Sequence, residues 1–241
     1  MKMKTIIITA AIILSGSLLY AQKNHSAFEV SINGGISSPL GDFGKGDYAD
    51  EKSGFAKTGY NFNVTGTYFM HKGFGIGALV GFSQFGFKGS QDLADGYKED
   101  SGTDSTTLYT KGHTRTFSVL AGPYYSIEAG KKVSVDLRAL GGYVNTHLAG
   151  FQVFYEDGLD NSMSQKESSA GAFGFQLGAA IKYKVTNRIA VKINADYFSS
   201  TPKINIFYEN FVVNSGRKLI EYNESISGIN ATVGIAFSLY K

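Results

Sequence analysis

Alternation of apolar residues with small or polar ones is the feature that most constrains this chain. It recurs in eight segments, and a period of two is typical of a strand with one apolar face. In residues 229–239, for example, every odd position is Ile, Ala, Val, Phe or Leu. The segments are 28–37, 60–70, 74–83, 114–126, 133–143, 173–183, 189–197 and 229–239. After residue 21, no segment has a helical period, so the sequence predicts an all-β fold.

The connections between these segments alternate in length. Short links follow the second, fourth and sixth segments, as in His71-Lys72-Gly73. Long polar loops, roughly 38–58, 88–113, 146–170 and 199–225, follow the others. This alternation predicts an up-and-down meander of eight antiparallel strands, with both ends of the chain on the side of the short turns.

The first 21 residues have the layout of a secretory signal peptide. Lys2 and Lys4 precede an apolar stretch over residues 6–20, and Ala21 is a small residue suited to cleavage. We therefore expect a signal peptide over 1–21 and one domain over 22–241; a retained membrane anchor is the alternative. No Pro-rich or charged linker divides the second part, and the chain has no cysteine for disulfide bonds.

Alternation alone does not distinguish a membrane barrel from a soluble sandwich. Three features favour the barrel: strands of about ten residues or more, long enough to cross a bilayer when tilted, a second face rich in Gly, Ala, Ser and Asn, and the alternating loop lengths. Small residues suit the crowded lumen of an eight-stranded barrel, and a sheet in lipid must close on itself. The sequence therefore predicts a transmembrane barrel with an outward apolar face, short periplasmic turns and long outer loops. A soluble barrel or sandwich is the alternative.

Aromatic residues lie towards the strand ends on the apolar face, where the girdles of such barrels are found. They are Tyr60, Tyr68, Phe74, Phe82, Tyr125, Tyr143, Phe173, Tyr183, Tyr197 and Phe237.

Several short segments carry a resemblance to a known family. They are Tyr20-Ala21-Gln22 and the stretches 38–43 (SPLGDF), 120–125 (LAGPYY), 137–143 (LRALGGY) and 195–200 (ADYFSS). With them the chain resembles the outer-membrane β-barrel domain family abundant in Bacteroidota, the porin-like or PorT-like small barrels. The resemblance implies a multi-pass protein of the cell outer membrane of a Gram-negative bacterium, without an assigned substrate. One departure is Lys241, which follows the expected C-terminal aromatic residue, Tyr240.

The predicted lumen holds charges of both signs. We expect a polar network there of Glu29, Asp136, Arg138, Gln176, Lys192 and Asp196. Such charges can pair and plug a narrow interior, or they can line a pathway for a small solute. We favour the plug, because side chains leave little room inside eight strands.

The outer loops are the second candidate site. Loop 88–111 is predicted to be a solvated loop, whereas the loops around 151–158 and 204–216 each read as a strand followed by a turn. These two loops are expected to form hairpins above the membrane, whose edges bind a surface protein or glycan partner. The binding candidates are Phe154, Tyr155, Phe207, Tyr208 and Phe211.

Other functions find little support in the sequence. Without Lys2 and Lys4, 21 basic residues stand against 20 acidic ones, which offers no electrostatic argument for nucleic acid. The four histidines are scattered, so neither a metal nor another cofactor is expected, and no catalytic triad stands out. We expect a monomer in outer-membrane lipid that is not an enzyme. Its role is structural or surface-interacting through the outer loops; the alternative is a narrow porin-like channel for small solutes.

Overall fold

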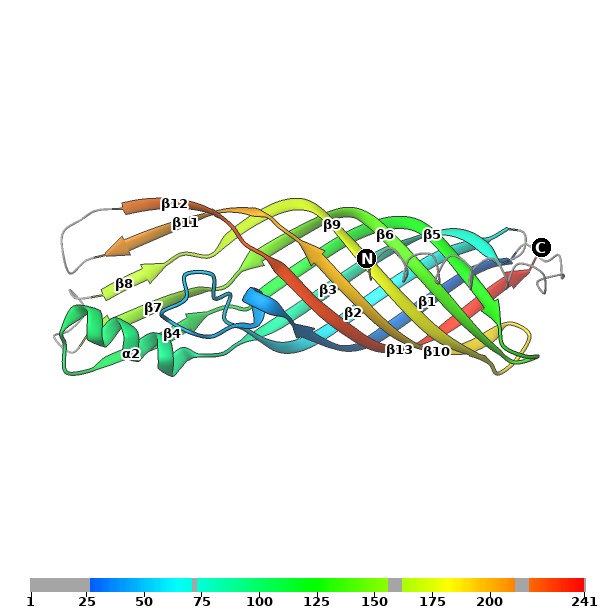
Figure 1. The fold of residues 1–241 in the computed structure, drawn as a ribbon, viewed down its shortest axis with the longest axis horizontal. Coiled ribbons are helices and arrows are strands. Elements are labelled where there is room, and N and C mark those ends of the chain that lie inside the picture. The colour runs from blue at the N-terminus through cyan, green and yellow to red at the C-terminus, as the bar shows by residue number, and fades with distance from the viewer. Residues whose placement is uncertain (1–26, 71–72, 156–161, 211–216, 241) are drawn as a thin grey trace, which may run out of the picture.

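Eight long strands form a closed antiparallel barrel in the computed structural model (Figure 1). The structure describes residues 27–70, 73–155, 162–210 and 217–240, so the predicted signal peptide lies outside the described residues. In spatial order β1-β13-β10-β9-β6-β5-β3-β2, each barrel strand pairs with its neighbours in the meander. The strands are β1 (Ala27–Pro39), β2 (Ala56–Phe69), β3 (Phe74–Phe87), β5 (Thr114–Glu128), β6 (Val133–Leu148), β9 (Ser168–Lys184), β10 (Ile189–Ser200) and β13 (Ile226–Tyr240).

The first and last strands close the barrel. They pair along their whole length, from Ala27 opposite Tyr240 to Pro39 opposite Gly228. The start of β1 and the end of β13 therefore lie on the side of the short links 129–132 and 185–188. The predicted eight-stranded up-and-down barrel is confirmed.

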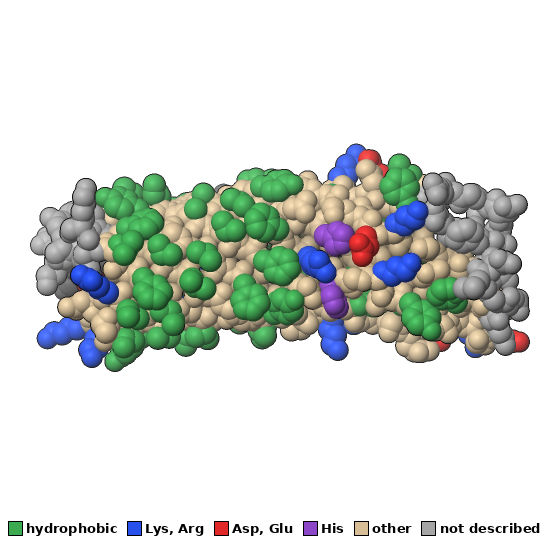
Figure 2. Space-filling model, turned by 180° about the vertical axis from the view of Figure 1, so that it is seen from behind, with side chains coloured by type: hydrophobic (Ala, Val, Ile, Leu, Met, Phe, Trp, Pro, Cys, Tyr) green, Lys and Arg blue, Asp and Glu red, His purple; other side chains and the backbone are tan. Residues whose placement is uncertain are grey.

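The apolar face of the barrel points outward. Ile32, Phe173 and Val233 are 60%, 73% and 58% exposed, whereas inward neighbours such as Ser31 and Thr232 are buried. Apolar side chains cover a broad band on one half of the face seen in Figure 2. This arrangement is the inverse of a soluble sandwich and suits contact with lipid. Within the described residues, no helix is both long and apolar enough to span a membrane.

The lumen also contains an apolar cluster that the alternation pattern did not predict. Phe69, Leu79, Leu120, Tyr124, Leu140 and Val144 are buried against one another inside the barrel. Glycines on the same inner faces make room for them: a Cβ on Gly77 would lie 2.7 Å from the ring of Tyr124. The interior is therefore packed with side chains.

A second sheet of five strands rises above the barrel on its long-loop side (Figure 1). The hairpins predicted in the third and fourth loops are present in it, and a strand from the second loop joins them. Its order is β12-β11-β8-β7-β4. The strands are β4 (Thr106–Lys111), β7 (Gly150–Tyr155), β8 (Ser162–Gln165), β11 (Lys203–Asn210) and β12 (Arg217–Asn223).

The prediction of a plain solvated loop over 88–111 is wrong. Residues Ser90–Ser101 form helix α2, which ends at Gly102 in the left-handed region (φ 66°). Leu93 and Tyr97 lie one helical turn apart and pack on the inner face of the second sheet, against Phe151. The rest of the helix is mostly polar, so its sequence has only a narrow apolar face. The helix is stabilised by a tertiary contact that periodicity alone does not reveal.

The first outer loop covers the mouth of the barrel. It contains the 3-10 turn η2 (Gly41–Gly44), in which Phe43 is fully buried. Phe43 packs edge-on against Phe85, with ring centroids 5.0 Å apart, and joins Ala56 and Ile226 in one cluster. The barrel is thus closed at this end by packed side chains.

Candidate functional site

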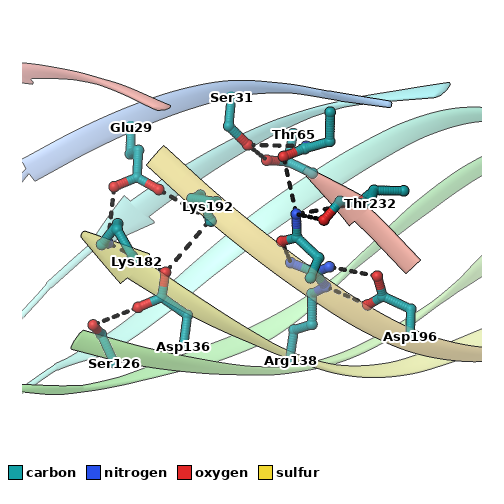
Figure 3. A network of polar contacts seen from close by, with 12 residues as sticks. Glu29, Ser31, Thr65, Ser126, Asp136, Arg138, Lys182, Lys192, Asp196 and Thr232 are labelled. Carbon is teal, nitrogen blue, oxygen red and sulfur yellow. Dashed lines mark hydrogen bonds and ion pairs between the residues drawn. The ribbon is translucent and has the colours of Figure 1, made fainter. Parts of the chain in front are cut away.

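Four charged side chains from four strands meet in the lumen near the short-turn end (Figure 3). The Nζ of Lys182 lies 2.9 Å from Glu29 Oε2 and 3.2 Å from Asp136 Oδ2. The Nζ of Lys192 lies 3.2 Å from Glu29 Oε1 and 3.4 Å from the same Asp136 oxygen. Ser126 donates a further hydrogen bond of 2.6 Å to Asp136 Oδ1. Each carboxylate therefore bridges two ammonium groups.

A second cluster lies farther along the lumen. Arg138 donates from Nε and Nη2 to the two oxygens of Asp196, at 2.7 and 2.6 Å, in a bidentate pair. Its Nη1 donates to Asn194 Oδ1 at 3.2 Å, and Asn194 in turn donates to Asn33 and Thr232. The Arg138 and Asp196 side chains are 2% and 0% exposed, so this pair is shielded from water.

The strand register explains why Arg138 and Asp196 meet. Both lie opposite Gly178, Arg138 on one neighbouring strand and Asp196 on the other. Because glycine has no side chain, the two charged groups reach each other over the central strand. A Cβ on Gly178 would lie 1.8 Å from Asp196 Oδ1. The glycine is therefore part of the site.

The lumen charges balance. Among the described residues, the buried charged side chains of the barrel are Glu29, Asp136, Arg138, Lys182, Lys192 and Asp196, three of each sign. The sequence reasoning missed Lys182, although the alternation had placed it on the polar face. Without it the proposed set carries one excess negative charge. Neutrality of a closed, poorly hydrated interior was the signal that would have found this residue.

Gln176 is buried but lies apart from the ion clusters. It lines a small void together with Asn61, Asn63 and Leu79. The void has a volume of about 20 Å³, which is room for about one water molecule. A void of this size has no room for a solute larger than water.

The outer-loop candidates separate onto two faces of the second sheet. Phe154 points outward and meets Tyr109 edge-on, with ring centroids 5.6 Å apart. Phe207 is 46% exposed, opposite Leu219 on the next strand. Tyr155 instead lies in the buried core with Met163, because successive residues of a strand face opposite sides. Tyr208 lies on β11, and Phe211 is outside the described residues.

A buried carboxyl lies at the outer mouth. Glu224, in the link between β12 and β13, is 5% exposed. Burial, with a smaller contribution from Asp42, raises the pKa of Glu224 to about 7. A Cβ on Gly54 would lie 2.8 Å from both Glu224 Oε1 and the backbone of Phe43. The carboxyl is thus packed against the first outer loop.

Over the parts of the chain that the structure describes, no group of three or more His, Asp or Glu side chains is placed to hold a metal ion.

Comparisons with known proteins give the family and the fold. The model of the outer membrane protein beta-barrel domain matches residues 7–237. The comparison with curated protein sequences found no match. Among solved structures, a major outer membrane protein of Thermus thermophilus is 13% identical, with 89% of this chain and 99% of that chain covered and a TM-score of 0.50. At this identity the likeness shows the fold alone.

Two further solved structures are similar to a lower degree. Ail, the attachment invasion locus protein of Yersinia pestis, is 12% identical over 89% of this chain and 99% of that chain, with a TM-score of 0.46. The outer membrane protein OprG of Pseudomonas aeruginosa is 11% identical over 90% and 99%, with a TM-score of 0.47. With the closed barrel, its outward apolar face and the family match, the chain belongs to the outer membrane protein beta-barrel domain family and lies in the outer membrane of a Gram-negative bacterium.

Proposed function

We propose that this protein is a non-conducting outer-membrane barrel that binds a surface protein or glycan through its second sheet. The observation that carries the proposal is the organisation of the outer half. It has five paired strands and a buried core of its own, with Leu93, Phe151 and Val153 in that core. A stable sheet projecting from a closed barrel is suited to present a fixed surface to a partner.

The outward face of this sheet has the composition of a binding surface. Tyr109, Phe207 and Leu219 are each 46–59% exposed, and Phe154 packs against Tyr109. Polar groups such as Asn205 and Gln152 lie between these side chains on the same strands. Aromatic rings with interspersed amides suit contacts with either a protein or a sugar.

The closed lumen supports a non-conducting barrel over the narrow porin-like channel. The Arg138–Asp196 pair and the four-charge cluster are buried, and the void beside Gln176 has room for about one water molecule. We expect the protein in planar bilayers to give no single-channel conductance. Conductance by the unaltered protein would favour the channel instead.

Surface binding is tested on cells that display the protein. We expect them to bind an array of immobilised proteins and glycans, and Phe154→Ser/Phe207→Ser to lose that binding. The matched control is Val185→Ser, which changes an exposed apolar residue at the opposite end. Deletion of 204–220 with binding intact would contradict the proposal.

Three narrower assignments complete it. The segments 38–43 and 195–200 support a place among the porin-like or PorT-like barrels of Bacteroidota. The layout of residues 1–21 supports a signal peptide cleaved after Ala21, which N-terminal sequencing of the mature protein tests. Closure of the barrel sheet supports a monomer, because no barrel strand is left with a free edge for pairing.

A further inference from the structure

A row of polar side chains crosses the outside of four neighbouring barrel strands. Gln84 on β3 lies opposite Arg115 on β5, which lies opposite His147 on β6, which lies opposite Ser169 on β9. Directly opposed residues on one face have Cβ atoms about 5 Å apart. The four side chains therefore form one continuous strip.

This strip lies immediately beyond the apolar band. Phe117 is two residues nearer the short-turn end than Arg115, and it is 46% exposed on the same face. Tyr143 and Phe173, each four residues below the strip, are 53% and 73% exposed. Aromatic girdles mark the interface between the hydrocarbon and the headgroups, so Arg115, directly beyond Phe117, is at the height of the outer headgroups.

Exposed basic residues lie on the strip and beside it. Lys111 and His113, at the junction of β4 and β5, are exposed beside it. Within the described parts of the chain, Arg115 and Lys111 have no ion-pair partner, whereas Lys45 and Lys203 elsewhere in the outer region are paired with carboxylates. Basic and histidine side chains gather between the apolar band and the outer end (Figure 2).

Lys111, His113, Arg115 and His147 form a basic patch, and one carboxylate, that of Glu167, belongs to it. Its Oε2 lies 3.4 Å from His147 Nε2, while His147 Nδ1 is 2.8 Å from Ser169 Oγ. The imidazole and the carboxylate thus engage each other, and the guanidinium of Arg115 remains open beside them. On β1, β10 and β13, the outward residues near the outer ends of the strands are hydroxyls, Ser38, Ser199 and Ser227. The positive patch is therefore one-sided.

We propose that this patch, centred on Arg115 and Lys111, binds the phosphate of a lipid headgroup in the outer leaflet. A lipid whose chains lie along Phe117 and Tyr143 has its headgroup at the height of Arg115. A guanidinium pairs with phosphate in a bidentate manner, and a lysine ammonium adds a point charge. The site depends on the position of the barrel in the membrane and is independent of partner binding by the second sheet.

The test measures lipid A binding by native mass spectrometry in phosphatidylcholine nanodiscs. We expect Arg115→Gln/Lys111→Gln to weaken binding by roughly 25-fold, since each cation near a charged membrane surface contributes about a factor of five. The matched control is Lys131→Gln/Lys132→Gln, which removes two exposed cations at the short-turn end and should bind as the unaltered protein does. A heat-modifiable gel band shows that each variant is folded.

Four results would overturn the proposal. The outer variant could bind lipid A as tightly as the unaltered protein, or the control variant could lose as much affinity. Displacement by millimolar inorganic phosphate would assign the patch to free phosphate. Binding of heparin without binding of lipid A would assign it to a soluble acidic glycan.

Discussion

At the scale of single residues, a glycine decides whether a buried ion pair can form. Gly178 is the clearest case, because it lies between Arg138 and Asp196 and leaves the space in which they pair. Buried ion pairs stabilise a protein only when their geometry is good and their hydrogen bonds are complete. The bidentate geometry of this pair meets that condition and depends on one glycine.

We expect Gly178→Ala to lower the free energy of unfolding by about 3–5 kcal/mol, the cost of separating a buried charge pair. The added Cβ would lie 1.8 Å from Asp196 Oδ1 and force that carboxylate away. Urea titration in lipid vesicles, followed by the heat-modifiable band, measures the loss. Gly66→Ala is the control, because its Cβ would meet only the Phe28 ring at 3.7 Å. Equal stability of the two variants would contradict the role of Gly178.

The raised pKa of Glu224 predicts that the packing of the first outer loop at the mouth depends on pH. Its pKa is raised by burial from 4.5 to about 7, so the folded state favours the neutral carboxyl. The stability that this group contributes is complete below about pH 4.5 and is lost as the pH rises through about 7. About one-tenth of Glu224 is charged at pH 6 and about nine-tenths at pH 8.

Hydrogen exchange over residues 40–55 checks this prediction. After correction for intrinsic rates, we expect faster exchange at pH 8 than at pH 6, because the charged carboxyl disfavours packing against Phe43. Glu224→Gln should remove the difference, since its side chain is neutral at both values. A difference that persists in this variant would assign the effect to another group.

At the scale of elements, the outer sheet and α2 stabilise each other. Five barrel strands are followed or preceded by outer strands, while β1, β2 and β3 have none. Helix α2 and the first loop cover the inner face of the outer sheet, where Leu93 and Tyr48 meet its core. An uncovered apolar face of this sheet would be prone to aggregation. Helix α2 and the first loop remove that face from water.

We expect Leu93→Ala to destabilise the outer region by about 2–5 kcal/mol, the usual cost of removing a buried leucine side chain. The barrel itself should remain intact, because Leu93 belongs to a core separate from the lumen clusters. Trypsin should then cleave the variant after Lys98 while its heat-modifiable band persists. The control is Glu99→Ala on the exposed side of α2, which should resist trypsin as the unaltered protein does.

At the scale of the whole molecule, the barrel is apolar outside and electrically neutral inside. Among the residues that the structure describes, three carboxylates and three cations are buried in the lumen. Lys182 also lies over the ring of Phe69, at 5.1 Å from its centroid, so the charged cluster and the apolar cluster are continuous. The lumen thus behaves as a packed core enclosed by a membrane-spanning wall.

We expect Lys182→Met to lower the free energy of unfolding by about 3–5 kcal/mol, because it leaves Glu29 and Asp136 with one cation between them. Adding Asp136→Asn restores neutrality and should recover about 1–2 kcal/mol. Urea titration in vesicles measures Lys182→Met, Asp136→Asn and the double variant. Strict additivity of the losses of the two single variants would argue against a coupled network.

The period of two determined the strands and the side of each residue. It placed the odd-numbered residues of 229–239 outward and Lys192 and Asp196 inward, because the pleat of a strand alternates faces whatever the strand pairs with. The alternating loop lengths determined the meander and its direction. Phe154 and Tyr155 were both proposed for binding, although the same pleat allows only one of them to face outward.

Which inward side chains meet was decided only by the tertiary structure. Arg138 and Asp196 are 58 residues apart, and Glu29 and Lys192 are 163 apart. Their contacts depend on the register of strand pairs and on closure of the barrel, which no local pattern encodes. The same holds for α2, whose narrow apolar face has meaning only beside the outer sheet. Local backbone geometry thus set the architecture, and long-range register set the site.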